Sequence, residues 1–123
     1  MSVRGLDERL PRGERLRKRS EYLTVQARGQ RAAGQMLVVY AKPHGPDESR
    51  SAARIGITVG KQVGNAVVRN RVKRLLRESY RHSPGIKNHA ADLVVIAKPT
   101  AAQGSYQVLA DELRRLVRAG GRR

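Results

Sequence analysis

The side chains best suited to chemistry in this sequence are the cations of residues 65–81, and the chemistry they suit is phosphate binding. At about 100° per residue, a helix over this segment has an apolar face that holds Val68, Val72, Leu75, Leu76 and Ser79. The opposite face carries Asn70, Lys73, Arg77 and Arg81, flanked by Arg71 and Arg74. Guanidinium groups pair well with phosphate oxygens, and Glu78 is the only acid between Arg69 and Arg81. We therefore interpret this face as a polyanion-binding surface rather than a merely solvated one.

The net charge points to the same kind of partner. Lys and Arg number 26 against 10 Asp and Glu in 123 residues, which gives a net charge of +16. A folded protein with this charge attracts anionic partners, and nucleic acid is the first candidate. A membrane span is excluded by the pattern, because no apolar run approaches the roughly 18 residues that a span needs. The N-terminus has no apolar signal-peptide core and the chain has no cysteine, so we expect a cytoplasmic protein.

We expect the elements that must position these cations to form one α+β domain over residues 20–119. We expect a mobile basic arm over residues 1–19 and a short basic tail over residues 120–123. The expected elements are a helix over 21–28 with Ser20 as N-cap, strands over 36–40 and 54–60, a helix between the N-cap Asn65 and Ser83, a strand over 93–97 and a helix after Ser105. This order, α-β-β-α-β-α, predicts a small sheet flanked by helices.

The acidic residues do not form a pattern that could cleave a phosphodiester. A metal-dependent nuclease needs convergent carboxylates, whereas the acids here are mostly the surface pairs Asp7-Glu8, Asp47-Glu48 and Asp111-Glu112. Asp92 stands alone and is interpreted as a turn or cap residue, and His44, His82 and His89 are interpreted as surface histidines. We therefore expect no catalytic residue and no tightly bound metal in the protein.

An ordered set of motifs resembles the signature of the bacterial ribonuclease P protein subunit. The central run is RIGITVGK at residues 54–61, followed by VGNAV at 63–67 and RNRVKRLLRE at 69–78. Ser20-Glu21-Tyr22 resembles the first helix of the family, and LVVIAKP at 93–99 resembles the strand after the basic helix. The resemblance covers roughly residues 16–118 and runs through a strand, a turn and a helix in the correct order.

This resemblance implies a fold, an activity and a set of partners. The family fold places the basic helix in a left-handed crossover between parallel strands, against the usual handedness. The family protein assists a ribonucleoprotein that removes the 5′ leader from precursor tRNA, with the chemistry and the Mg²⁺ ions in the RNA subunit. The implied partners are ribonuclease P RNA and the leader of precursor tRNA, with no membrane and no small-molecule substrate.

The resemblance also assigns roles to individual residues. The RNA-binding positions that match the family motif are Arg69, Asn70, Arg71, Lys73, Arg74 and Arg77. The positions implied for a leader cleft are Tyr22, Tyr40, Gly56, Thr58, Gly60 and Lys61. The small residues of the strand could instead be covered tightly by a helix, Tyr22 could be a core-edge tyrosine, and Lys61 could be an exposed turn residue. Gln26 replaces a second aromatic residue found in many family members, and Gln62 replaces a lysine.

Two other functions remain open from the residues alone. A structural ribosomal protein, or another RNA-binding protein without a role in cleavage, would share the size, the charge and the basic helix. A sequence-specific DNA-binding module is disfavoured, because the basic helix lies between strands rather than in a helix-turn-helix.

Overall fold

The computed structural model describes residues 12–45 and 52–121. Most of the predicted arm and the last two residues of the predicted tail therefore lie outside the described residues. Residues 15 and 16, which we assigned to the arm, contact the sheet. Arg15 bridges to Ile55, and the N–H of Leu16 donates to the carbonyl oxygen of Ile55 at 3.0 Å. Leu16 is 4% exposed, so packed structure begins before the domain boundary predicted at residue 20.

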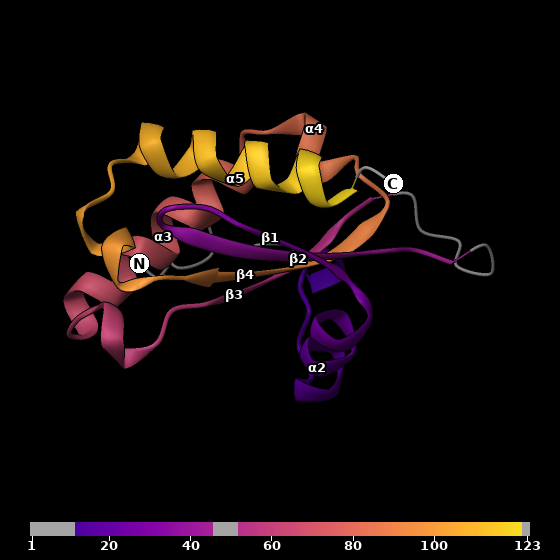
Figure 1. Cartoon of the computed structure of the whole chain (residues 1–123), viewed down its shortest axis with the longest axis horizontal. Coiled ribbons are helices and arrows are strands. Elements are labelled where there is room, and N and C mark those ends of the chain that lie inside the picture. Colours follow the sequence, from indigo (N-terminus) through magenta and orange to yellow (C-terminus); the bar gives the residue numbers. More distant parts are fainter. Residues whose placement is uncertain (1–11, 46–51, 122–123) are drawn as a thin grey trace.

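Four strands form one mixed sheet (Figure 1). They are β1 (Gln30–Ala33), β2 (Leu37–Pro43), β3 (Arg54–Thr58) and β4 (Ala91–Ala97), in the spatial order β1-β2-β4-β3. β2 is antiparallel to both β1 and β4, whereas β3 is parallel to β4. Because β3 and β4 are parallel, the chain between them must cross over one face of the sheet.

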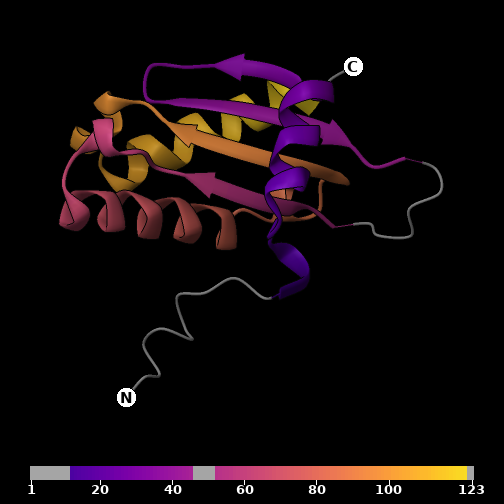
Figure 2. The ribbon, with the colours of Figure 1, turned by 90° about the horizontal axis from the view of Figure 1, so that it is seen from below.

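The helices lie on both faces of this sheet (Figure 1). They are α2 (Arg19–Arg28), α3 (Ala66–Arg81), α4 (Pro84–Lys87) and α5 (Tyr106–Gly121), with short 3-10 helices η1 (Arg12–Glu14), η2 (Lys61–Val63) and η3 (Pro99–Gln103). α3 and α5 cover one face and α2 covers part of the other. Figure 2, seen from the side of α2, shows β3 and β4 running the same way with α3 beyond the sheet, which makes the crossover left-handed as the resemblance implies.

The local sequence of α3 explains both its start and its orientation. The side chain of Asn65 accepts a hydrogen bond from the N–H of Val68 at 3.0 Å, which confirms Asn65 as the N-cap. The side chains that α3 buries are Val72, Leu75, Leu76, Ser79 and Tyr80. The predicted apolar face is therefore confirmed, and the basic residues are left toward the rim of the helix.

Two apolar clusters of unequal size hold the fold together. The larger lies between the sheet and the α3–α5 layer and includes Leu37, Leu76, Leu93, Leu109 and Leu113. The smaller lies under α2 and consists of Leu16, Val25 and Val94, with Tyr22, Tyr40 and Ile96 packed against it. Most of the hydrophobic stabilisation therefore comes from the side of the sheet away from α2.

Several predicted element boundaries were wrong. α2 begins at Arg19 rather than after Ser20, because the Glu21 carboxylate accepts the N–H groups of Arg17 and Lys18 at 2.8 and 3.1 Å. Lys18, not Ser20, therefore occupies the N-cap position. β3 ends at Thr58 because the chain turns into η2, so Gly60 lies outside the strand. β1, η2, η3 and α4 were not predicted.

Candidate RNA-binding surfaces

Three rows of residues cross the face of the sheet that carries α2. The strand register gives the rows Lys42–Asp92–Arg54, Tyr40–Val94–Gly56 and Val38–Ile96–Thr58. α2 contacts the first row through Arg54 and the second through Gly56. The third row lies nearest the carboxyl ends of β3 and β4, and its Ile96 packs at the edge of the smaller apolar cluster. Thr58 is exposed and Ile96 is partly exposed, whereas Val38 is buried at 8% exposure. The third row therefore offers an accessible strip on β3 and β4, next to α2.

Tyr22 and Gly56 form one packed unit. A Cβ atom at Gly56 would lie 2.5 Å from Cζ of Tyr22, so only glycine lets the tyrosine ring approach the strand this closely. Burial and the neighbouring Glu21 raise the pKa of the Tyr22 hydroxyl. Gly56 is therefore covered by a helix side chain, which was the alternative to an open cleft floor, whereas Thr58 is open. Gly60 is likewise filled, because a Cβ atom there would meet the side-chain amide of Gln62.

The first row contains an ion-pair network that the sequence did not predict. Arg54 donates from Nε to Oδ1 of Asp92 at 3.0 Å and from Nη2 to Oδ2 at 2.8 Å, and its Nη1 donates to Oε2 of Glu21 at 3.2 Å. Nε2 of His44 lies 2.9 Å from Oδ1 of Asp92. The side chains of His44 and Asp92 are 3% and 7% exposed, so the interpretations of a surface histidine and a turn residue were both wrong.

This network fixes α2 on the sheet. Burial alone would raise the pKa of the Asp92 carboxyl, but hydrogen bonds from Arg54 and His44 and the Arg54 charge outweigh burial and hold it below its ordinary value. The backbone N–H groups of Arg17 and Lys18 lower the pKa of Glu21. Because Glu21 both caps α2 and binds Arg54, the network also sets the position of the adjacent Tyr22.

The six predicted RNA-binding residues of α3 differ in how their side chains are used. Arg69 donates from Nε to the Gly64 carbonyl at 3.1 Å, and Arg71 donates to the carbonyls of Ala102 and Gly104 at 3.3 and 2.8 Å. These two arginines bind neighbouring loops. In contrast, no hydrogen bond or ion pair within the described residues uses the side chains of Lys73 and Arg74. Asn70 is exposed, and Lys73, Arg74 and Arg77 are partly exposed.

Lys61 lies in the short segment that joins the third row of the sheet to α3. It is exposed at the start of η2, which joins the end of β3 to α3. Gly64 then turns the chain with φ of 158°, and a Cβ atom there would lie 2.9 Å from Val68. The turn at Gly64 thus leads the chain from exposed Lys61 into the first turn of α3.

The described carboxylates and histidines form no group that could hold a metal ion. No group of three or more His, Cys, Asp or Glu residues that could hold a metal ion exists among residues 12–45 and 52–121. Glu112 was interpreted as a surface charge, and this was wrong, because it is 6% exposed and accepts the N–H groups of Met36 and Leu37 at 2.7 Å each. Asp7, Glu8, Asp47 and Glu48 lie outside the described residues. In the same described ranges, no helix has the length and apolar content of a membrane span.

Comparisons with known proteins agree with this geometry. The family model for ribonuclease P matches residues 10–120. Relatives named ribonuclease P protein component include one from Streptomyces avermitilis, 39% identical over 122 residues (92% of this chain and 99% of the relative). Another, from Alkaliphilus metalliredigens, is 36% identical over 104 residues (85% and 90%).

Solved structures of this kind of protein share the fold. The RNase P protein of Staphylococcus aureus has a TM-score of 0.74 at 29% identity and covers 86% of this chain and 94% of its own. The protein from Thermotoga maritima has a TM-score of 0.74 at 26% identity, with 86% and 96% covered. The chain therefore belongs to the family of ribonuclease P protein components, the protein subunits of the ribonucleoprotein endoribonuclease that processes tRNA 5′ ends, and its partner is the ribonuclease P RNA.

Proposed function

We propose that the third row of the sheet, with Tyr22 and Tyr40 beside it, binds the 5′ leader of precursor tRNA. The observation that carries this proposal is the accessible strip beside α2, bordered by exposed Thr58 and partly exposed Ile96 and followed in the chain by the cation of Lys61. Partly exposed aromatic rings can stack on bases without reading their sequence. The strip therefore suits an extended single strand of variable sequence.

We further propose that α3 binds ribonuclease P RNA through the cations at its rim. Lys73 and Arg74 are available for phosphate, while Arg69 and Arg71 fix the loops that flank the helix. The chemistry then belongs to the RNA subunit, which holds the Mg²⁺ ions, and the protein contributes positioning and charge neutralisation. The proposed place of action is the cytoplasm, where precursor tRNA is made.

A pair of substitutions at Thr58 tests the leader assignment. In holoenzyme reconstituted with ribonuclease P RNA, Thr58→Glu should weaken binding of leader-bearing tRNA, because it sets a negative charge beside the leader phosphates. Thr58→Gln is the matched control of the same size and should bind nearly as tightly as the unchanged protein. Mature tRNA should show no difference between the two variants. An equal loss for leader-bearing and mature tRNA would contradict the leader assignment.

The division of labour with the RNA is tested by cleavage. Rigorously RNA-free protein should leave precursor tRNA intact at any Mg²⁺ concentration, and it should stimulate cleavage by ribonuclease P RNA at low Mg²⁺. Cleavage by the protein alone, lost on Asp92→Asn, would overturn the assignment of the chemistry to the RNA.

A further inference from the structure

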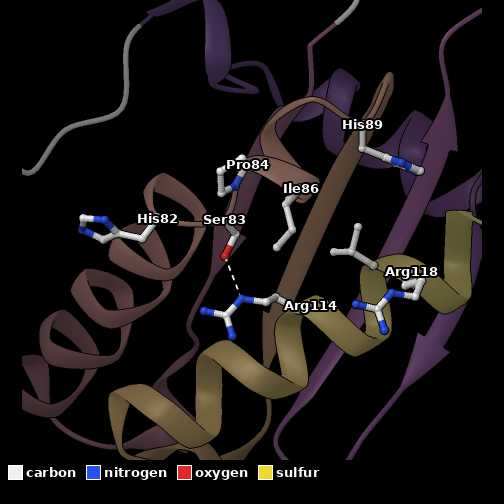
Figure 3. A pocket seen from close by; sticks show the side chains of 9 residues that line it. His82, Ser83, Pro84, Ile86, His89, Arg114 and Arg118 are labelled. Atoms are coloured by element: carbon white, nitrogen blue, oxygen red, sulfur yellow. Dashed lines mark hydrogen bonds between the residues drawn. The ribbon is translucent and has the colours of Figure 1, made fainter.

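A cavity lies on the opposite side of the sheet from α2, where the end of α3 meets α4 and α5. Its volume is about 580 Å³, within the range of roughly 300–1,000 Å³ typical of small-ligand sites. Figure 3 shows the residues that line it. α2 and the third row of the sheet lie on the other face (Figure 1), so this cavity is separate from the proposed leader strip.

The lining of the cavity combines an apolar wall with cations. Ile86 of α4 and Val117 of α5 are each 3% exposed and form the apolar part. Arg114 and Arg118 lie one turn apart on α5, and His89 lies across from them (Figure 3). The ring of His82 points away from the other lining side chains in this view. No acid is among the lining residues that the structure describes, so the cavity suits an anion that has an apolar, flat body.

Arg114 is held in place before any ligand arrives. Its Nε donates to Oγ of Ser83 at 3.0 Å, and its Nη1 donates to Asp111 at 2.9 Å. Ser83 is only 4% exposed, which fixes one end of this arrangement at the junction of α3 and α4. A guanidinium that is already oriented loses little side-chain entropy when it binds a phosphate, and exposed Arg118 can close on the same group.

We propose that this cavity is a nucleotide-binding pocket. The base lies against Ile86 and Val117, and its phosphate lies between Arg114 and Arg118. Planar guanidinium groups both pair with phosphate oxygens and stack on bases, and this accounts for two arginines beside an apolar wall. The same chemistry fits a free mononucleotide or a nucleotide unstacked from a bound RNA, and the experiment below separates these sources. The site is distinct from the proposed leader strip and does not depend on it.

Adenosine 5′-monophosphate is the probe for the pocket itself. In the full-length protein, titration should shift the backbone amide resonances of Ile86, His89 and Val117. Arg118→Gln should weaken this binding roughly five- to tenfold, the loss of one charge-assisted hydrogen bond at an exposed site. Arg115→Gln is the matched control, because it removes the same charge from α5 at a position outside the cavity, and it should change the affinity less than about twofold.

A second pair of variants keeps the test decisive if Arg118→Gln does not fold. A side chain at Gly85 meets no atom within 4 Å of its Cβ, so Gly85→Glu adds a negative charge beside the cavity without a clash. It should weaken binding of the probe, and Gly85→Gln should not. Absence of shifts at the cavity, or equal affinity for each variant and its control, would overturn the proposal.

Assembly with ribonuclease P RNA then identifies the source of the nucleotide. If the pocket holds a nucleotide of that RNA, Arg118→Gln should lower the RNA affinity more than Arg115→Gln does, and bound RNA should exclude the probe. If both variants bind RNA equally and the probe still shifts the cavity resonances in the complex, the ligand is a free mononucleotide.

Discussion

The two faces of the sheet differ in how completely they are used for stability. The face under α3 and α5 is buried along its length, with Leu37, Leu93 and Val95 at 0% exposure. The face under α2 has a small apolar cluster between an ion-pair network and a row that is open at Thr58. The strand surface that carries most of the core is covered by α3 and α5, so the fold places stability and the proposed leader contact on opposite faces of the sheet.

The difference extends to the helices. α5 and α3 pack on the sheet through apolar side chains, whereas α2 is held by the apolar contacts of Tyr22 and Val25 and by Arg54, which binds both Glu21 and Asp92. Ion pairs fix orientation more than they add stability, because desolvation offsets much of their attraction. The ion pairs therefore fix the orientation of α2 on the sheet, although α2 is only weakly stabilised. A helix at the border of a binding strip can be held in this way.

The comparison is tested most strongly by truncating one residue on each face of β4. Leu93→Ala, under α3 and α5, should lower the free energy of unfolding by about 2–5 kcal/mol, because it leaves a cavity in the main core. Ile96→Ala, in the open row, should cost only about 1 kcal/mol, because its side chain is partly exposed. Urea denaturation measures both values.

Leader affinity should show the reverse order. Ile96→Ala should weaken binding of leader-bearing tRNA by the holoenzyme, and Leu93→Ala should not at temperatures where it remains folded. Equal destabilisation by both substitutions would mean that the third row is packed as tightly as the core, and the contrast between the faces would be wrong.

The second test concerns the attachment of α2. Arg54→Met should lower the free energy of unfolding by about 1–3 kcal/mol, because it leaves the Asp92 and Glu21 carboxylates without their shared partner. Arg54→Lys keeps the charge but loses the two-pronged contact with Asp92, so it should recover only part of the loss. Lys42→Met in the same row is the control. Full recovery by lysine would show that charge alone, not geometry, holds α2.

Much of the fold could be predicted because its signals are local. The apolar residues of α3 repeat at helical spacing entirely within residues 66–81, and its N-cap, Asn65, is the residue just before them. β1 was missed because Gln30-Arg31-Ala32-Ala33 contains no β-branched or aromatic residue. Its pairing with β2, rather than its own composition, holds it in the strand conformation. A strand of this kind is formed by its neighbour, so no pattern within it could reveal it.

The ion-pair network could not be predicted for a related reason. Arg54 lies 38 residues from Asp92 and 33 from Glu21, and only the register of β3 with β4 and the placement of α2 bring the three together. The same holds for Arg71, whose position on the helix wheel indicated an RNA-facing side chain but whose partners lie in and just after η3. Helical spacing predicts the face on which a residue lies, not the loop that packs there.

The third test separates the two kinds of cation on α3. Arg71→Ala should lower the free energy of unfolding by about 1–2 kcal/mol, because the carbonyls of Ala102 and Gly104 lose their donor. Lys73→Ala should change stability by less than about 0.5 kcal/mol. It should instead reduce the slope of log RNA affinity against log salt by roughly 0.7–0.9, the value for one phosphate contact. A slope unchanged by Lys73→Ala would remove this residue from the proposed RNA surface.

The smallest expected effect is the response of the α2 side to acid. The pKa values of Asp92 and Glu21 lie below their ordinary values in the folded protein, so both carboxylates stabilise the fold when they are charged. This contribution is complete above the pKa values of the unfolded chain, about 4, and is lost as the pH falls through the lower folded values. Asp92→Leu should therefore flatten the decline in unfolding free energy between about pH 5 and pH 3 relative to the unchanged protein. If Asp92→Leu and the unchanged protein show the same acid dependence, the network does not titrate as a unit with folding, and the orientation of α2 must depend on its apolar contacts alone.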